Sequence, residues 1–333
     1  MFQNFLATLI CFFALIGCVS PMLSSERIIQ SSQNQTVPAH QGAPLNLGVL
    51  EINDPSIYNK VFVISDIHGM YDQLEALLKA GHVISDSNDW IAGRSLFIVV
   101  GDSIDKGPKS LEVLDLFIKL QEQASAEGGA VIHVLGNHEA EFLADPINDT
   151  KAAELINEMK AQNVPLTDLT TSITPRGLFL HSEPLAAKVG HWLFCHSGFY
   201  PDMVWADFKA QAKLVLDANN YGSDFLIGKN SILEAKDWEK SNMTLMPVLK
   251  RMDNLGVFGI VFGHQPTAFK IVGRSAAKVG GRLIKIDNGI PPESGSHKGS
   301  LLVFDNPAQM SSDRFPQINV ISPDGSEKPL IPE

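Results

Sequence analysis

Short apolar segments alternate with amphipathic stretches from about residue 60 onward. The apolar segments are VFVIS, SLFIVV, AVIHVL, HWLFC, VFGIVF, RLIKI and LLVF. Most of them are almost continuously apolar, as expected for strands that are buried on both faces. The first three are separated by the predicted helices Tyr71–Ala80 and Pro108–Ala126. This alternation of strand and helix predicts an α/β fold.

The same pattern sets the expected domain boundaries. One α/β domain is predicted over residues 59–305, interrupted by mostly helical, polar insertions at about 140–187 and 201–255. Residues 19–58 include a segment rich in Ser and Gln and are interpreted as a flexible spacer. Residues 306–333 are rich in Pro and Ser, so we expect a peripheral tail.

The N-terminus has the composition of a targeting segment. No charged side chain occurs before Glu26, and the run FLATLICFFALIG is short for a membrane span. It predicts a signal peptide over residues 1–18, and the sequence LIGC resembles a bacterial lipobox with Cys18 as the lipidated residue. We therefore expect export, as a periplasmic or membrane-anchored lipoprotein. No Lys or Arg precedes the apolar run, so a plain secretory signal or an uncleaved anchor stays open.

Charge and cysteine content argue against nucleic-acid binding and against a disulfide-stabilised fold. The formal net charge is -11, which argues against a broad basic surface and hence against a nucleic-acid partner. Of the three cysteines, Cys11 and Cys18 lie in the leader and Cys195 in the body. The mature chain therefore cannot build a disulfide framework within itself.

Residues with an oxygen or imidazole ligand atom follow five of the predicted strands, usually beside a glycine. Each motif alone is weak evidence, because Asp-x-His or Gly-Asp is often a helix cap or a turn. Together they form a pattern, because sites in α/β sheets lie at the carboxyl ends of strands. The carboxylate, amide and imidazole groups concerned are those of Asp66, His68, Asp102, Asp105, Asn137, His138, His196 and His264.

Five sequence blocks now carry a family resemblance. SDIHG, GDSIDKG, GNHE, CHSGFYP and FGHQP resemble the blocks of the calcineurin-like metallophosphoesterases, and more narrowly those of the phosphoprotein phosphatase branch. SLEVLDLFIKLQEQASAEGGAVIHVLGNHE is similar to the Shewanella-like protein phosphatases in particular. The resemblance covers about Lys60–Phe304. It implies an α/β/β/α sandwich of two mixed sheets flanked by helices, with the active site at the C-terminal strand ends.

The resemblance also implies a dinuclear metal site. One divalent ion would be held by Asp66, His68 and Asp102, and the second by Asp102, Asn137, His196 and His264, so that Asp102 bridges the two. Such mixed ligands suit Mn, Fe or Zn, and the sequence does not select among them.

The expected reaction is hydrolysis of a phosphate monoester, carried by a phosphoprotein or a small molecule. A hydroxide bridging the metals would attack phosphorus in line, without a phosphoenzyme. His138 would protonate the leaving oxygen, and Asp105 would orient His138 and favour its imidazolium form. The alternatives are a hydrolase of diesters or dinucleoside polyphosphates, and a non-catalytic lipoprotein that binds metal or phosphate.

The chain departs from the family pattern where phosphate is gripped. Lys106 stands where the family has Arg, and a lysine offers one mobile charge in place of a planar fork. Asn137, Lys106 and Arg176 are the predicted phosphate-binding residues, although Arg176 fits a surface loop equally well. Lys236 lies in the region of a second family arginine and is a further substitute. Ser197 replaces a glycine beside His196.

The remaining residues of note are interpreted as structural. His133 lies within the third predicted strand and is expected to be a packed core histidine, and Cys195 to be a buried, inert thiol. Asp287 and Asn288 fit either a group that supports a metal-binding histidine or a simple turn. No strand end precedes the other histidines, which are expected at the surface: His40, His82, His181, His191 and His297.

Overall fold

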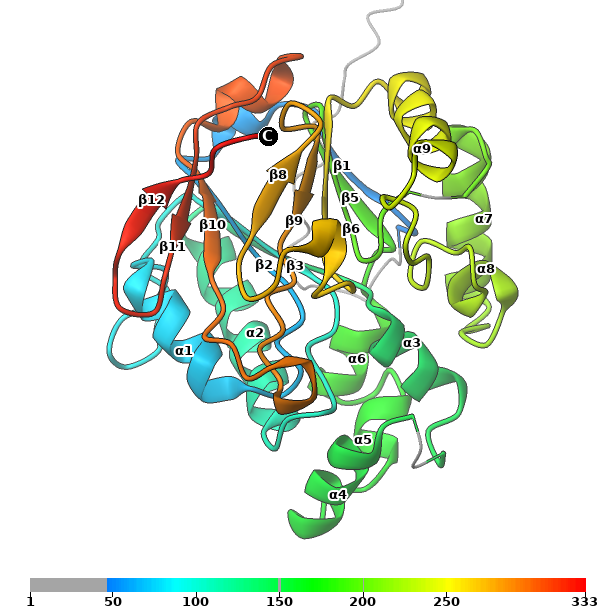
Figure 1. Ribbon diagram of the computed structural model, residues 1–333. Coiled ribbons are helices and arrows are strands. Elements are labelled where there is room, and N and C mark those ends of the chain that lie inside the picture. The colour runs from blue at the N-terminus through cyan, green and yellow to red at the C-terminus, as the bar shows by residue number, and fades with distance from the viewer. Residues whose placement is uncertain (1–46, 149–150, 200) are drawn as a thin grey trace, which may run out of the picture. The chain divides into compact units, whose positions relative to one another are not determined.

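Two mixed six-stranded sheets pack face to face in the computed structural model, which describes residues 47–148, 151–199 and 201–333 (Figure 1). The first sheet has the strand order β1 (Leu50–Ile52), β5 (Ala186–Val189), β6 (Trp192–Cys195), β7 (Gly259–Phe262), β9 (Leu283–Lys285), β8 (Ala276–Lys278). The second has the order β12 (Glu327–Pro329), β11 (Ile318–Ile321), β10 (Leu301–Phe304), β2 (Val61–Ile64), β3 (Leu96–Val100), β4 (Ala130–Val134).

Helices cover the outer face of each sheet. The helices are α1 (Tyr71–Ala80), α2 (Ser110–Ala126), α3 (Asn137–Ala144), α4 (Ala153–Ala161), α5 (Thr167–Thr170), α6 (Pro175–His181), α7 (Trp205–Asp217), α8 (Asp224–Ile227) and α9 (Asn242–Leu255). Short 3₁₀ turns occur at Pro55–Ile57, Ala268–Lys270, Pro292–Ser294 and Pro307–Ser311. Figure 1 shows α1 and α2 beside β2 and β3, whereas α7, α8 and α9 lie on the other side of the sandwich. The predicted α/β/β/α architecture is confirmed.

The alternation of side chains along β2 explains the layers. Val61 and Val63 face the core between the sheets, while Phe62 and Ile64 pack under α1 and α2. The two sheets meet at large rings, such as Trp192 of β6 and Phe304 of β10, whose centroids lie 5.4 Å apart. Strands buried on both faces must be apolar throughout, and this accounts for the continuous apolar runs in the sequence.

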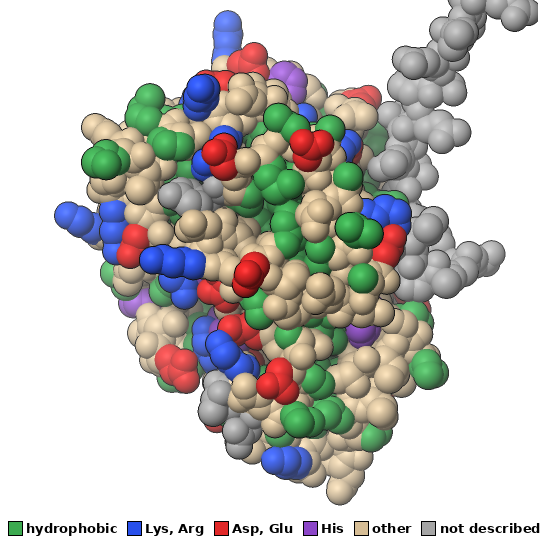
Figure 2. All heavy atoms as spheres, turned by 90° about the vertical axis from the view of Figure 1, so that its right-hand side faces the viewer, with side chains coloured by type: hydrophobic (Ala, Val, Ile, Leu, Met, Phe, Trp, Pro, Cys, Tyr) green, Lys and Arg blue, Asp and Glu red, His purple; other side chains and the backbone are tan. Residues whose placement is uncertain are grey.

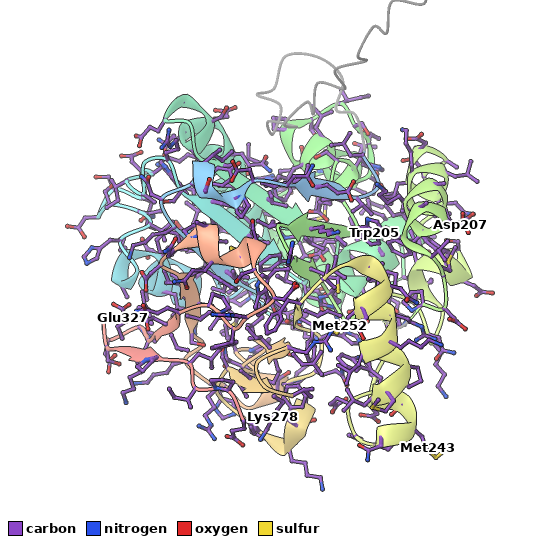
Figure 3. All side chains as sticks on the ribbon, turned by 90° about the horizontal axis from the view of Figure 1, so that it is seen from above. Trp205, Asp207, Met243, Met252, Lys278 and Glu327 are labelled. Atoms are coloured by element: carbon purple, nitrogen blue, oxygen red, sulfur yellow. The ribbon has the colours of Figure 1, made fainter. Side chains whose placement is uncertain are left out.

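Helix α9 shows how the second helical layer is attached. Its buried side chains are Val248, Met252 and Leu255, which recur at the spacing of one helix face. In Figure 3, Met252 lies on the inner side of the helix and Met243 at its outer end, where 88% of the Met243 side chain is exposed. The helix ends at Gly256, whose left-handed backbone suits a glycine.

Strand directions bring five strand ends to one edge of the sandwich. β2 pairs in parallel with β3, and β3 with β4. In the other sheet β6 pairs in parallel with β7. The loops that follow these five strands therefore leave the sheets at their carboxyl ends, where sites of α/β proteins form.

Two of the predicted boundaries are wrong. Residues 47–58 belong to the fold, because Leu50–Ile52 forms β1 and pairs in parallel with β5. The expected tail also belongs to it, since β11 and β12 extend the second sheet beyond β10 and Met310 is fully buried. The strands concerned are only three or four residues long, which is too short for a reliable pattern, and their assignment depends on pairing with the sheet.

The predicted leader and Cys18 lie outside the described residues, as does His40. Signal peptide, lipidation and export therefore stay predictions from the sequence. No helix within the described ranges is long and apolar enough to cross a bilayer.

Helix α4 attaches to the start of α2 through one buried carboxyl group. Glu158 accepts hydrogen bonds from the backbone N–H groups of Ser110 (2.7 Å) and Leu111 (3.0 Å). These groups would otherwise be unpaired in the first turn of α2. Burial and the neighbouring Glu112 side chain raise the pKa of Glu158 to about 8. The folded chain thus holds a proton that the unfolded chain, with an ordinary pKa near 4.5, releases.

We expect this pair to make stability fall with pH. The stabilising contribution is complete below the unfolded pKa of 4.5 and is lost as the pH rises through the folded pKa of about 8. In Glu112→Gln the amide can donate to an ionised Glu158. Between pH 5 and pH 8.5 the fall in Tm of this variant should therefore be smaller than that of the wild type, by roughly 2–4 °C. Thermal unfolding of both proteins across this range checks the prediction. Parallel curves would contradict it.

Candidate metal centre

Backbone hydrogen bonds join four of the five strand-end loops in two pairs. The Asp66 N–H donates to Gly101 O (3.1 Å) and the His68 N–H to Asp102 O (2.9 Å), which joins the loops after β2 and β3. In the other sheet the Gly263 N–H donates to His196 O (2.8 Å). Within each sheet, the polar side chains that follow these neighbouring strands are therefore held side by side.

The backbone of these loops is unusual. Left-handed φ values between 48° and 64° occur at Asp66, His68, Asp102, Asp105, Lys106 and His264. Non-glycine residues rarely adopt this conformation, and it costs free energy wherever it occurs. Its concentration in loops after three strands indicates that the loops are shaped for a site.

Glycines make room for the carboxylates. A Cβ atom at Gly136 would clash with Asp102 Oδ1, and one at Gly263 would clash with Asp66 Oδ2. Each carboxylate thus lies against bare backbone of a neighbouring loop. This close approach explains why a glycine stands beside the ligand residues in the sequence.

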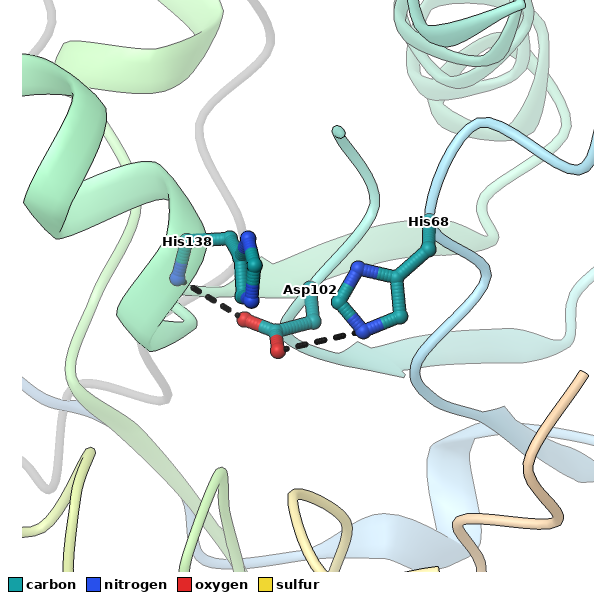
Figure 4. A group of neighbouring side chains, drawn as sticks. All are labelled: His68, Asp102 and His138. Carbon is teal, nitrogen blue, oxygen red and sulfur yellow. Dashed lines mark hydrogen bonds and ion pairs between the residues drawn. The ribbon is translucent and has the colours of Figure 1, made fainter. Parts of the chain in front are cut away.

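Asp102 lies at the centre of the cluster and faces two groups of residues. Its Oδ2 lies 3.4 Å from His68 Nε2, and its Oδ1 lies 3.3 Å from His196 Nε2. Figure 4 shows His68 and His138 on either side of the Asp102 carboxylate. His68 Nε2 is also 4.0 Å from Asp66 Oδ1. The position of Asp102 matches that expected of a carboxylate shared by two metal ions.

A second group of ligand atoms meets at Asn137. Its Oδ1 lies 3.0 Å from His196 Nε2 and 3.0 Å from His264 Nδ1. Backbone carbonyls fix two of the imidazoles: His68 Nδ1 lies 3.1 Å from Ile104 O, and His196 Nδ1 lies 2.9 Å from Val100 O. Such contacts leave the opposite ring nitrogen, Nε2, facing the cluster, as metal-binding histidines require.

The donor set fits divalent metal ions. Ligand atoms of Asp102, His68 and His138 lie within 4.8 Å of one another, and so do those of Asp102, His196 and His264. Burial lowers the pKa of His68 and of His264 well below the ordinary value, so both are neutral and can bind a metal. Burial alone would raise the pKa of Asp102, but the adjacent histidines outweigh it and hold that pKa well below its usual range. All six predicted ligands are brought together.

His138 occupies the expected position of a general acid. Its Nδ1 lies 3.2 Å from Asp105 Oδ2, and its side chain is 14% exposed. Burial alone would lower the pKa of His138, but Asp102 and Asp105 outweigh it and raise that pKa. Asp105 is held in turn, because its Oδ1 accepts the Glu154 N–H of α4 (3.0 Å). This arrangement leaves Nε2 of a protonated His138 available to donate.

The predicted phosphate-binding residues are only partly brought together. Lys106 and Lys236 line the cavity over the ligand residues, and Lys106 Nζ lies 3.0 Å from His68 Nε2. Arg176 does not line this cavity, so its predicted role is wrong. Its guanidinium pairs with Asp115 of α2 (2.6 Å) and with Asp168 of α5 (2.9 Å), and it joins helices rather than facing the site.

Glu139 supports the site and was missed as a functional residue. It is fully buried, and it accepts the backbone N–H groups of Gly136, Asp102, Ser103 and Ile104 at 2.7–3.2 Å. One carboxylate therefore fixes the loops after β3 and β4 around the shared ligand. A glutamate three residues after a helix cap is a sequence signal for a side chain that accepts the N–H of the cap residue. Here the same carboxylate also accepts N–H groups of the loop after β3.

Lys285 is a second residue that sequence reasoning missed. It is fully buried in β9, and its Nζ donates to Pro266 O and Ile271 O, each at 2.8 Å. Burial lowers its pKa to about 8. These carbonyls belong to the loop that begins with His264, so Lys285 holds this ligand-bearing loop against the sheet.

The observed positions of the residues that we interpreted as structural fit that interpretation. His133 is buried, with Nε2 2.5 Å from Ser103 Oγ and Nδ1 2.9 Å from Glu183 Oε1. Cys195 is buried, and burial raises its pKa to about 12. Asp287 lines the cavity over the ligand residues, and its carboxylate also accepts the Gly289 N–H in a turn. His82 is exposed, while His181, His191 and His297 are half-buried.

Comparisons with known proteins place the chain in a family. The family model for calcineurin-like phosphoesterases matches residues 59–268. Shewanella-like protein phosphatase 1 of Plasmodium berghei is 29% identical over 157 residues, which is 44% of this chain and 43% of that protein. The chain thus spans less than half of that relative's length. An asymmetrical bis(5'-nucleosyl)-tetraphosphatase, PrpE of Bacillus velezensis, is 28% identical over 62% of this chain and 87% of its own.

A solved structure supports the fold independently. The cold-active protein-tyrosine phosphatase of a Shewanella species superposes with a TM-score of 0.67 at 22% identity, covering 85% of this chain and 82% of that one. At this identity the match speaks for the fold alone. The family model covers most of the chain, and the Shewanella-like resemblance predicted from the sequence is confirmed. The protein is a member of the calcineurin-like phosphoesterase family.

Proposed function

We propose that the protein is a dinuclear metal-dependent phosphoesterase that hydrolyses phosphate monoesters. The observation that carries this proposal is the position of Asp102, whose two carboxylate oxygens face separate groups of ligand atoms. Two divalent ions bound there, Mn, Fe or Zn, would supply a water nucleophile of lowered pKa and positive charge for the phosphoryl oxygens. Asp66 and His68 would hold one ion, and Asn137, His196 and His264 the other.

The remaining groups act on the substrate directly. Lys106 and Lys236 line the cavity and would bind phosphoryl oxygens as point charges. Asn137 and His138 are the first residues of α3, whose N-terminus favours an anion. His138 would donate its Nε2 proton to the leaving oxygen while Asp105 holds the other ring nitrogen. General acid catalysis of this kind contributes about 10²–10⁴-fold.

A second candidate is hydrolysis of dinucleoside polyphosphates. The observation in its favour is the similarity to PrpE, which extends over 87% of that relative. Ligand residues and the general acid would be the same, and the substrates would differ in the group that leaves.

Hydrolysis of three substrates separates these candidates. The proposal predicts turnover of p-nitrophenyl phosphate, little turnover of bis(p-nitrophenyl) phosphate, and loss of turnover after treatment with a chelator. Higher kcat/KM for diadenosine tetraphosphate than for p-nitrophenyl phosphate would support the second candidate. Metal-independent turnover, or none on any of the three substrates, would contradict both.

A further inference from the structure

The cavity over the metal-binding residues is too small for a whole substrate. Its volume is about 70 Å³, and it is lined by ligand residues together with Lys106 and Lys236. Pockets that enclose a small ligand measure about 300–1,000 Å³. The cavity thus suits the phosphoryl group, and the remainder of the substrate must lie outside it.

A larger cavity of about 620 Å³ shares Lys236 with the metal cavity. It lies between α3, the segment 227–238 and the first turn of α9. We call it the Lys236 groove, and its charged and polar lining includes Glu141, Lys151, Lys229, Glu234, Lys236 and Thr244. Figure 2 shows the side of the molecule on which α7, α8 and α9 lie, where basic and acidic side chains are interspersed. A cavity of this volume can hold a group the size of a nucleotide.

The groove begins where a leaving group would depart. Glu141 lies three residues after His138 on α3, so both project from the same face of the helix. Glu234 also connects the two cavities, because its Oε2 lies 4.0 Å from His264 Nε2. A leaving oxygen protonated by His138 would therefore carry the rest of its molecule toward this groove.

Three acidic and three basic side chains line the groove, and they differ in how closely they are paired. Lys151 pairs with Glu141 (2.5 Å), and Asp237 pairs with Lys240 (2.6 Å). Within the part of the chain that the structure describes, no carboxylate oxygen lies within 4 Å of the Nζ atom of Lys229 or Lys236. Lys229 and Lys236 thus line the groove without a carboxylate in contact, and Glu234, which also lines it, offsets part of the Lys236 charge. Such ammonium groups attract an anion.

We propose that the Lys236 groove binds the leaving group of the phosphoester, and that Lys229 and Lys236 favour a leaving group that carries a second phosphate, as a nucleotide does. This proposal rests on the proposed phosphoesterase function.

The test is a selectivity ratio measured on two related monoesters. The wild type should show a higher kcat/KM for adenosine 3′,5′-bisphosphate than for adenosine 3′-phosphate, since only the former leaves with a phosphate. Lys229→Glu should lower this ratio about tenfold, mainly through KM, because the change removes an attraction and adds a repulsion. Lys250→Glu is the matched control: Lys250 is an exposed lysine of α9 outside the groove lining, and the ratio should not change.

Each other outcome has a defined meaning. If the metal-loaded wild type hydrolyses none of the two adenosine compounds and p-nitrophenyl phosphate, the proposed function itself is contradicted. If both proteins hydrolyse the two compounds and the ratio of kcat/KM values is the same in the wild type and in Lys229→Glu, the groove proposal alone is contradicted. A Lys229 effect confined to acidic phosphopeptides also overturns it, because the groove would then select a peptide rather than a nucleotide. Equal Tm values of the two variants exclude a folding effect.

Discussion

Replacing His138 with asparagine is expected to lower kcat on p-nitrophenyl phosphate by about 10²–10⁴-fold while metal content stays the same. The loss corresponds to about 2.7–5.5 kcal/mol of transition-state stabilisation. The variant lacks the group that protonates the leaving oxygen. Its backbone N–H still donates to Asp102 Oδ1, which in the wild type lies 3.0 Å away, so the shared ligand keeps its contact. Steady-state kinetics and elemental analysis of the same sample check the prediction.

A matched substitution controls for nonspecific effects. His82 is exposed and has a left-handed backbone (φ 53°), which asparagine tolerates well. His82→Asn should therefore keep the wild-type kcat. If His138→Asn turns over the monoester as fast as His82→Asn does, His138 is not the general acid.

Replacing Asp102 with asparagine is expected to reduce turnover by about 10³-fold or more. A metal pair stabilises the transition state by several kcal/mol, and tenfold in rate costs about 1.4 kcal/mol. Asparagine offers one weak oxygen ligand where the carboxylate offers two charged ones. Its oxygen can still accept the His138 N–H, so the loop should keep its shape. Kinetics at saturating Mn²⁺ measure the effect.

The control for this variant is Asp207→Asn, which makes the same chemical change at an exposed position on α7 (Figure 3). It should have wild-type activity. Near-normal turnover of Asp102→Asn at saturating metal would mean that Asp102 does not join two ions. Loss of cooperative unfolding in that variant would instead point to a structural role of the carboxylate.

The candidate site could be predicted because its residues follow strands directly. A carboxylate or imidazole after an apolar run, next to a glycine, is placed at the strand end whatever the rest of the fold does. Asp66, Asp102, Asn137, His196 and His264 all belong to this kind. Parallel strands, which the alternating pattern indicated, bring the first three together, whereas the approach of His196 and His264 also needs the second sheet to pack on the first.

What could not be predicted depends on contacts between distant segments. Lys285 is a charged residue that would be assigned to a solvent face, yet two carbonyls of another loop satisfy it in the core. Arg176 was placed in the site because its partners on α2 and α5 cannot be read from the sequence. Strand β12, whose sequence is Glu-Lys-Pro, has no apolar pattern and exists only through its pairing with β11.

The number of metal ions bound per chain is the sharpest test of a dinuclear site. The purified protein would be stripped with a chelator, reconstituted with Mn²⁺, freed of weakly bound ions by gel filtration and analysed by elemental analysis. A dinuclear site should bind two ions per chain, and hydrolysis of p-nitrophenyl phosphate should return only as the second ion binds. One ion or none in a folded chain, or full activity in the stripped protein, would contradict this expectation.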